Sequence, residues 1–351
     1  MLRRTLYLTL TLFTLGSCSE KKVDAQATTE SEASAIEASA VLPKIEQVER
    51  VTITVENLET SLKFYKEVLH FEEVASYSLA GDELLQLTGL EDGGLSVKVV
   101  ELSLGSETIA LQEFSNESRI STIPEDSKSN DLWFQHIAIV VSDMDAAYAV
   151  LEEAGVEPVS KGPQTLPTYI TAAAGIKAFY FKDPDNHNLE VIYYPEGKGD
   201  SKWQEADGEL FLGIDHTAIG IEDTDASTDF YEDLLGFKTL GHSENYGPEQ
   251  EALNNVEGAR LWISGLGVGG TYNVEFLKYK APEGGRGYPS DSRVTDLWHW
   301  QIKLKVQNLE KLYEKLKDTS TQIISDDIVT INDRKQLMIR DVDGHAILLS
   351  E

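Results

Sequence analysis

Cysteine is nearly absent from this sequence, and positive charge is scarce. A single cysteine, Cys18, occurs in 351 residues, so no disulfide can form within the chain. The 60 aspartates and glutamates outnumber the 30 lysines and arginines, which gives a formal net charge of −30. A surface this acidic would repel the backbone of nucleic acid, and we therefore expect no nucleic-acid partner.

Several catalytic motifs are also missing. The sequence has no Gly-x-Ser-x-Gly elbow, and its one thiol lies in the N-terminal segment, so we expect neither a serine elbow nor thiol catalysis. The stretch GLGVGG from Gly265 is not followed by Lys-Ser/Thr, which excludes a phosphate-binding loop. The length and a hydrophobic content of 41% indicate a packed globular body of two domains or one large one.

The first 18 residues form a predicted targeting segment. Two arginines precede the apolar run Leu6–Leu15, which is too short for a typical membrane span and is typical of a secretory signal. The run ends in LGSC, which resembles a bacterial lipobox. This resemblance implies a lipid on Cys18, a bacterial membrane as partner, and a location in the cell envelope, periplasmic or surface-facing. The alternative is a cleaved soluble signal with an incidental cysteine. Residues 19–44 have the composition of a disordered tether.

Four similar phrases indicate an internal repeat. They are VTITVENLE from Val51, IAIVVSDMD from Ile137, TAIGIEDTD from Thr217 and IKLKVQNLE from Ile302. Each is an apolar strand that ends in a residue able to cap a helix, and an acidic residue follows in the first helical turn. The four predicted caps, about 80 to 86 residues apart, are Asn57, Asp143, Asp223 and Asn308.

Each unit is predicted to be a strand, a helix and then about three strands. Units one and three share FYKEVLHF and FYEDLLGF, whereas units two and four share a DLW lead-in and a late turn, DPDNHNLEV and DVDGHAILL. This alternation indicates that a block of two units was duplicated. The predicted blocks are 45–200, with modules 45–130 and 131–200, and 208–351, with modules 208–293 and 294–351.

These motifs resemble the vicinal oxygen chelate superfamily, which contains glyoxalase I, extradiol dioxygenases and the bleomycin-resistance proteins. The resemblance implies an α+β fold in which four βαβββ modules pair into two cupped, incomplete barrels. In this family a cup holds a divalent metal ion on the first residue of strand one and a glutamate of the last strand, from each module. The matching positions here are Arg50 and Ala110, His136 and Glu190, His216 and Glu275, and Gln301 and Leu348, in units one to four respectively.

Only units two and three carry both expected ligands, so the site depends on which modules share a cup. If one pairs with two and three with four, His216, Glu275 and Gln301 form one site, and Arg50 can pair with Glu190 in a cup without metal. If two pairs with three, His136, Glu190, His216 and Glu275 meet in one cup and the other cup has no ligand set. The second arrangement explains why units one and four lack ligands together, whereas the alternation of unit types favours the first.

The resemblance also implies the chemistry. Imidazole and carboxylate ligands suit Zn, Ni, Mn or Fe, and either Glu190 or Glu275 could act as the general base. We therefore expect a lyase or isomerase acting on a small molecule with adjacent oxygens. The alternatives are an extradiol-type dioxygenase and a non-catalytic protein that binds a small ligand. His187 and His345, in the matching late turns, are expected to be structural. The sequence indicates no oligomeric state.

Overall fold

The computed structural model describes residues 42–351, except for 92, 116–118, 206–207 and 271–272. The predicted signal segment, Cys18 and nearly all of the predicted tether lie outside the described residues. Within the described part of the chain, no helix combines the length and apolar character needed to cross a membrane.

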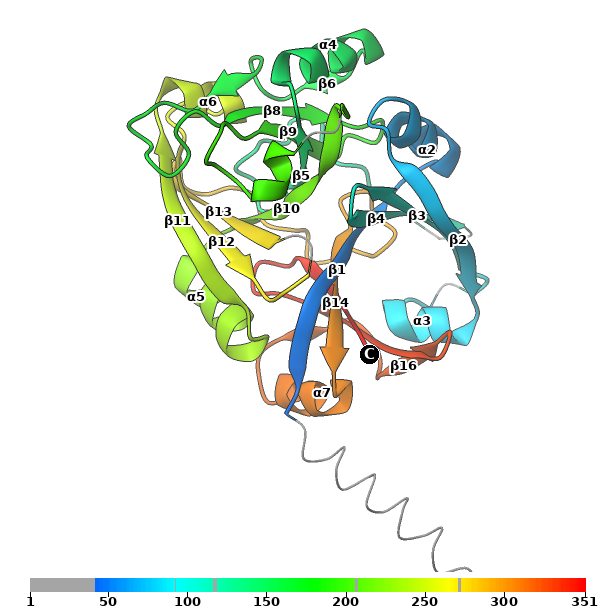
Figure 1. Ribbon diagram of the computed structural model, residues 1–351. Coiled ribbons are helices and arrows are strands. Elements are labelled where there is room, and N and C mark those ends of the chain that lie inside the picture. Colours follow the sequence, from blue (N-terminus) through cyan, green and yellow to red (C-terminus); the bar gives the residue numbers. More distant parts are fainter. Residues whose placement is uncertain (1–41, 92, 116–118, 206–207, 271–272) are drawn as a thin grey trace, which may run out of the picture. The chain divides into compact units, whose positions relative to one another are not determined.

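Two open nine-stranded sheets, neither of them closed into a barrel, carry the fold (Figure 1). The first has the order β15 (Gln322–Ile323), β17 (Arg334–Arg340), β18 (Ala346–Ser350), β14 (Trp300–Gln307), β1 (Lys44–Thr54), β4 (Glu107–Ser115), β3 (Ser96–Leu104) and β2 (Glu72–Ala80), and β16 (Val329–Ile331) pairs with β17. The second has the order β11 (Lys238–Tyr246), β12 (Arg260–Gly267), β13 (Asn273–Ala281), β10 (Phe211–Ile221), β5 (Gln135–Val141), β9 (Asn188–Tyr193), β8 (Lys177–Lys182) and β6 (Glu157–Pro158), and β7 (Gln164–Thr165) pairs with β8.

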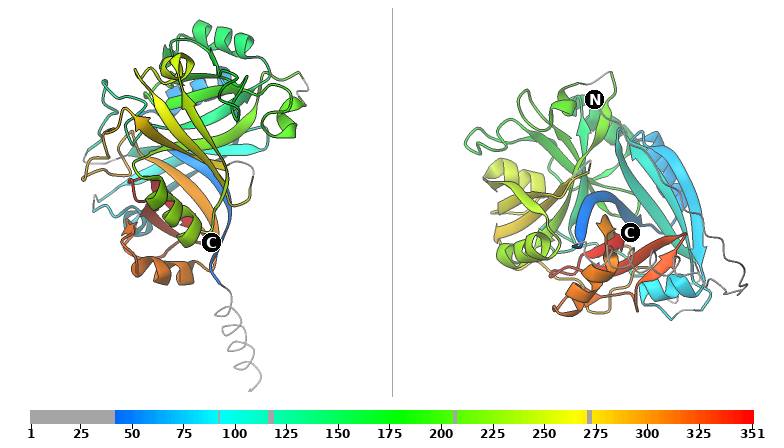
Figure 2. Two further views of the ribbon diagram at one scale, coloured as in Figure 1. Left: turned by 90° about the vertical axis from the view of Figure 1, so that its left-hand side faces the viewer. Right: turned by 60° about the horizontal axis from the view of Figure 1, so that its bottom comes forward.

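Modules that are distant in sequence share each sheet. Strand β1 of unit one pairs antiparallel with β14 of unit four, and β5 of unit two pairs antiparallel with β10 of unit three. Figures 1 and 2 show the blue β1 beside the orange β14. The crossed arrangement is therefore confirmed and the sequential one is wrong. Each predicted block contributes one module to each sheet.

The helices begin at the capping residues expected from the repeat. The helices with such a cap are α2 (Leu58–Glu67), α4 (Met144–Ala154), α5 (Thr224–Thr228) and α7 (Leu309–Lys317). In each, the Asn or Asp side chain accepts a hydrogen bond from a backbone N–H of the first turn, which satisfies a group that the helix leaves unpaired. Helix α5 continues as a π-helix, η2 (Asp229–Leu234), and shorter helices are α3 (Asp82–Thr88), α6 (Pro248–Asn254) and η1 (Ser201–Gln204).

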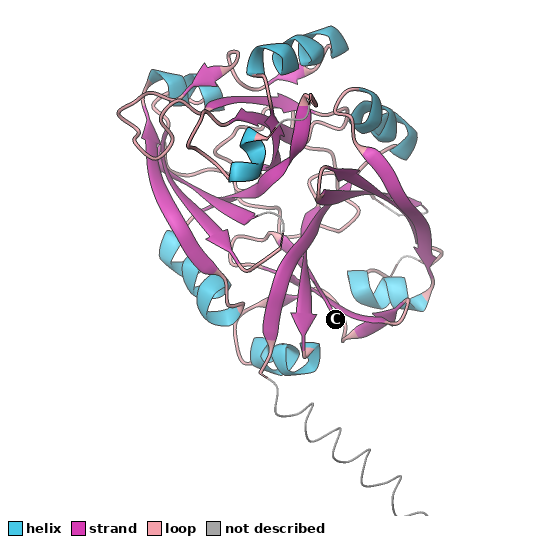
Figure 3. Ribbon diagram, in the orientation of Figure 1, coloured by secondary structure: helices cyan, strands magenta, loops and turns pink. Residues whose placement is uncertain are grey.

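The central strands separate two faces by simple alternation. Ile137, Ile139 and Val141 of β5 belong to the main apolar core, together with Met144 and Leu151 of α4. His136, Ala138 and Val140 of β5 point to the opposite face, which we call the inner face. The same core contains apolar residues of both sheets and of α2, α4, η2 and α7. Figure 3 shows these strands and helices in different colours.

Two buried histidine clamps connect the sheets. In the first, His187 Nδ1 lies 2.8 Å from Asp183 Oδ2 and Nε2 lies 2.6 Å from the backbone oxygen of Leu297, which precedes β14. Tyr65 of α2 also donates to Asp183 Oδ2 at 3.1 Å. Because both ring nitrogens face acceptors, the ring must donate twice and is best satisfied as imidazolium.

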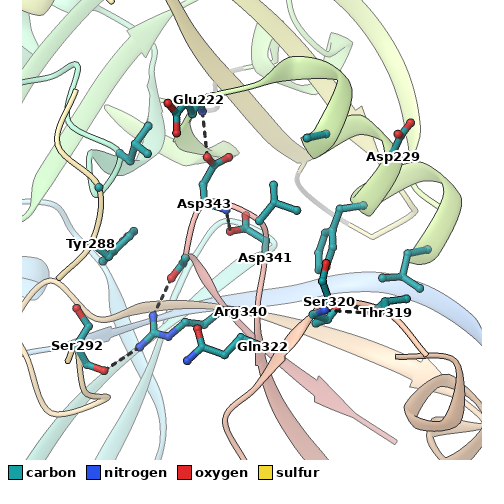
Figure 4. A pocket seen from close by; sticks show the side chains of 18 of the residues that line it. Glu222, Asp229, Tyr288, Ser292, Thr319, Ser320, Gln322, Arg340, Asp341 and Asp343 are labelled. Carbon is teal, nitrogen blue, oxygen red and sulfur yellow. Dashed lines mark hydrogen bonds between the residues drawn. The ribbon is translucent and has the colours of Figure 1, made fainter. Parts of the chain in front are cut away.

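The second clamp repeats this pattern with the sheets exchanged: its histidine belongs to the first sheet and its backbone oxygen to the second. His345 Nδ1 lies 2.8 Å from Asp341 Oδ2, its Nε2 lies 2.9 Å from the backbone oxygen of Leu132, and Tyr231 donates to the same aspartate. Figure 4 shows the adjacent pocket, where Asp343 accepts from the backbone N–H of Glu222. Both clamps thus hold a late turn of one sheet against the turn that precedes a central strand of the other.

The clamps predict a stability that falls at alkaline pH. Burial lowers the pKa of His187 and of His345, but the carboxylates of Asp183 and Asp341 raise each pKa by more, so both lie above the ordinary value. Their stabilisation is complete below the unfolded pKa of about 6.5 and is lost as the pH rises through the folded pKa. We expect the free energy of unfolding, measured with urea, to fall over this range.

The variants His187→Gln and His345→Gln should each lose about 3–5 kcal/mol at neutral pH, because a buried aspartate loses its charged partner. They should also show a smaller decrease in unfolding free energy with rising pH than the parent protein. His242→Gln, at an exposed residue of β11, is the control and should keep the parental pH profile. An unchanged pH profile in both clamp variants would contradict the imidazolium assignment.

Candidate metal centre

The two central strands of the second sheet place both candidate histidines on its inner face. His136 of β5 lies opposite Ala218 of β10, and His216 of β10 lies opposite Ala138 of β5. Because each histidine faces an alanine, whose side chain is a single methyl group, the space between the two rings stays open. This arrangement depends on the antiparallel register of β5 and β10.

The two glutamates follow from the outer neighbours of these strands. Glu190 of β9 lies beside Ala138, and Glu275 of β13 lies beside Ala218, both in parallel pairs. Residues that pair across strands point to the same face, so both carboxylates share the inner face with the histidines. The structure thus brings together all four side chains that the sequence analysis singled out in units two and three.

The ligand atoms lie at separations that a shared ion can bridge. His136 Nε2 is 3.2 Å from Glu190 Oε2, His216 Nε2 is 3.7 Å from the same oxygen, and His216 Nε2 is 3.4 Å from Glu275 Oε2. Ligands about 2.0–2.2 Å from one ion stand roughly 3–3.5 Å apart. His136, Glu190 and His216 offer atoms that all lie within 4.8 Å of one another, and Glu275 adjoins this group.

The polar atoms of this group also fit a metal. Nε2 of His136 and Nε2 of His216 are buried, have no hydrogen-bond partner and face the carboxylate oxygens of Glu190 and Glu275. Buried polar atoms are nearly always hydrogen-bonded, so ring nitrogens that converge on carboxylates without a hydrogen bond point to a cation between them. Burial lowers the pKa of His136 more than Glu190 raises it, which keeps this ring neutral and able to bind a metal.

His216 lies in a strongly negative environment. Burial lowers its pKa, but the carboxylates of Glu275, Asp215 and Glu190 raise the pKa to about 10. A field that favours a proton on this ring also favours a metal ion, because the two compete for the same nitrogen.

Asp215 supports His216 from behind and was missed by the sequence analysis. The Nδ1–H of His216 donates to Asp215 Oδ2 at 3.0 Å, which leaves Nε2 directed at the glutamates. Trp203 Nε1 and the Tyr194 hydroxyl each donate to Asp215 at 2.8 Å and fix its carboxylate. A carboxylate behind a histidine sets the ring's orientation and tautomer in many metal sites. The acidic residue directly before His216 was the available signal in the sequence.

A hairpin of the first sheet contacts the same strand. Glu107, at the start of β4, accepts from the backbone N–H of Ile214 at 3.2 Å and pairs with Lys202 at 2.7 Å. Gly105, with φ of 60°, forms the hairpin's tip, where an added Cβ would collide with the backbone oxygen of Leu212. The first sheet therefore helps to position the strand segment that carries His216.

The surroundings of the two glutamates differ. On β8, Tyr180 lies opposite Glu190, and its ring centre is 4.9 Å from that of His136. On β12, the residue opposite Glu275 is Gly265, and an added Cβ there would have no heavy atom within 4 Å. The Glu275 side chain is 28% exposed, against 5% for Glu190. The centre is therefore closed on the Glu190 side and open on the Glu275 side.

Apolar side chains form the wall around the centre. They come from β8, β12, β13, helix α6 and the loop after β7, and include Leu166, Ile170, Leu253, Leu261 and Leu277. Trp133 and Trp298, in the two DLW lead-ins, stack on each other with ring centres 6.4 Å apart and lie outside this wall.

Among the residues that the structure describes, the inner face of the first sheet carries no comparable ligand set. Its register matches that of the second sheet: Gln301 lies opposite Thr52, and Arg50 lies opposite Lys303. The positions that correspond to the two glutamates hold Ala110 and Leu348. Gln301 therefore lies in a different sheet from His216 and Glu275, and the condition under which it would join them as a ligand is not met.

Comparisons with known proteins agree with this architecture. A sequence profile of the Glyoxalase/Bleomycin resistance protein/Dioxygenase superfamily matches residues 47–191 and 213–349. No curated protein gave a match. Among solved structures, glyoxalase I from Zea mays is similar with a TM-score of 0.56 and 16% identity, over 90% of this chain and 94% of that chain. A proposed dioxygenase from Bacillus subtilis is similar with a TM-score of 0.52 and 12% identity, over 88% and 85%.

At these identities the solved structures establish a shared fold alone, while the profile covers most of the chain in two repeats. The chain therefore belongs to the Glyoxalase/Bleomycin resistance protein/Dioxygenase superfamily.

Proposed function

We propose that the protein is a divalent-metal-dependent lyase or isomerase that acts on a small molecule with adjacent oxygens. The observation that carries the proposal is the convergence of buried, unpaired histidine nitrogens on carboxylate oxygens at the inner face of the second sheet. His136, Glu190, His216 and Glu275 would hold the ion, and such a mixed set of nitrogen and oxygen ligands suits Zn, Ni, Mn or Fe.

The bound ion would supply Lewis-acid chemistry by polarising the substrate oxygens. The chain's own contribution is proton transfer, and Glu275 is the better base of the two glutamates. Its side chain is 28% exposed, against 5% for Glu190, so it can reach a substrate proton that the enclosed Glu190 cannot. Its side chain also adjoins the open space above Gly265, where a substrate would reach it.

An extradiol-type dioxygenase is the second candidate. His136, His216 and Glu190 form a compact group of two histidines and one carboxylate, which is the ligand set of many non-haem Fe(II) oxygenases. In that case the more exposed Glu275 would leave a coordination position open. A non-catalytic binding protein is the remaining alternative, and it would give turnover in neither assay described below.

Metal content tests the shared site. The variants His136→Ala and His216→Ala should each lose the metal of the purified protein, because both rings would bind the same ion. Gln301→Ala is the matched control, since it changes the corresponding position of the other sheet, and it should keep the metal. Elemental analysis of the purified proteins measures this. Retention of full metal content by either histidine variant would overturn the proposed centre.

Activity separates the roles of the two glutamates. Glu275→Gln should lower the turnover roughly 100- to 10,000-fold, the usual contribution of a general base. Glu275→Gln should keep much of the metal, whereas Glu190→Gln should lose both the metal and the turnover. Turnover of 2-oxoaldehyde–thiol adducts and oxygen uptake with catechols would distinguish a lyase from a dioxygenase. Full activity of Glu275→Gln would exclude it as the base.

We also propose that Cys18 is lipidated and anchors the protein in the bacterial cell envelope, facing the periplasm or the exterior. The support is the short apolar run Leu6–Leu15 and the LGSC motif that follows it. The wild-type protein should sediment with membranes and carry the mass of acyl chains, and Cys18→Ser should remove the added mass and release the protein. An unmodified wild-type mass would contradict the anchor.

A further inference from the structure

The inner face of the first sheet encloses a cavity although it has no ligand set. Its volume is about 410 Å³, which lies within the usual range of roughly 300–1,000 Å³ for small-molecule sites. One wall is apolar and is formed by strands β3, β4, β17 and β18 and helix α3, with Leu84, Leu87, Val97, Phe114 and Met338. The cavity is therefore shaped for a ligand with an apolar part.

The opposite side of this cavity carries positive charge, at one position where the other sheet holds a candidate metal ligand and at the position paired with it. Arg50 corresponds in register to His216, and Lys303, opposite Arg50, corresponds to Ala138. Their side chains are only 13% and 7% exposed. Since burying a cation is costly without a compensating anion, the arrangement calls for negative charge close by.

The carboxylates of the cavity do not balance its cations. Arg50 pairs with Glu101 at 2.9 Å, Lys303 pairs with Glu49 at 3.0 Å, and Arg334 shares Glu49 at 3.5 Å. Three cations therefore face two carboxylates among the described lining residues, which gives this part of the cavity an excess of one positive charge on a chain of net charge −30.

Arg50 also retains an unused donor. One of its terminal nitrogens binds Glu101 and the Tyr77 hydroxyl, the latter at 3.1 Å, but its Nε is buried and has no hydrogen-bond partner. A buried donor without a partner carries a desolvation cost of about 1–3 kcal/mol, which an acceptor on a ligand would relieve.

We propose that this cavity is a second ligand site and that it binds a small amphipathic monocarboxylate. The carboxylate would accept hydrogen bonds from Arg50 and Lys303, and the hydrocarbon part would lie against Leu84, Leu87 and Val97. A single negative charge matches the excess of one positive charge. A metal ion is the wrong ligand here, because the cations would repel it and no carboxylate stands at the corresponding strand positions.

Octanoate is a suitable probe, and isothermal titration of the purified full chain measures its binding. We expect one binding event, with much weaker binding of 1-octanol because it lacks the charge. Arg50→Gln and Lys303→Met should each weaken octanoate binding about 10- to 100-fold, the range for a hydrogen bond to a charged group. Circular dichroism melting would verify that each variant is folded. If Arg50→Gln does not fold, the binding measurement on Lys303→Met tests the proposal.

His216→Ala is the control that separates this site from the candidate metal centre. It should leave octanoate binding unchanged, whatever its effect on metal content. Loss of octanoate binding in His216→Ala would assign the ligand to the other sheet and overturn the proposal. The proposal would fail equally if octanoate did not bind, if 1-octanol bound as well as octanoate, or if folded Arg50 and Lys303 variants bound it like the parent.

Discussion

The antiparallel register between β5 and β10 is the constraint on which the candidate centre depends. It sets His136 opposite Ala218 and His216 opposite Ala138, so two rings and two small residues alternate across the join. A slip of one residue would turn one histidine towards the apolar core, because successive side chains of a strand point to opposite faces. The bulge in β10 between Ile214 and His216 lies where Glu107 of the first sheet accepts from the backbone N–H of Ile214. The register is thus held partly from outside its own sheet.

Much of this architecture follows from local signals in the sequence. The caps at Asn57, Asp143, Asp223 and Asn308 and the period-two strands were predictable because each depends on residues close together in the chain. The pairing of modules was not, because both arrangements satisfy every local pattern equally well. It is seen only in the long-range strand pairs, β1 with β14 and β5 with β10.

Within the centre, a similar distinction holds. The four candidate ligands could be found by comparing repeat positions, since each occupies the same place in its module. Trp203 could not be found in this way, because it lies in the connection between the two blocks. It contributes to the centre through its hydrogen bond to Asp215. The cationic cavity of the first sheet was also beyond prediction. Arg50 occupies a ligand position of the repeat, but its neighbour Lys303 corresponds to Ala138, which is not a ligand position.

The crossed pairing has a further consequence for how the two inner faces can differ. A protein made of one two-module block could build the same cups only as a symmetric dimer, and symmetry would then place every substitution in both cups at once. Fusing two blocks into one polypeptide removes that restriction. Histidine at position 136 and glutamine at position 301 can coexist because each is encoded separately. The covalent joining of the blocks therefore permits one half of a formerly equivalent pair to specialise without altering the other.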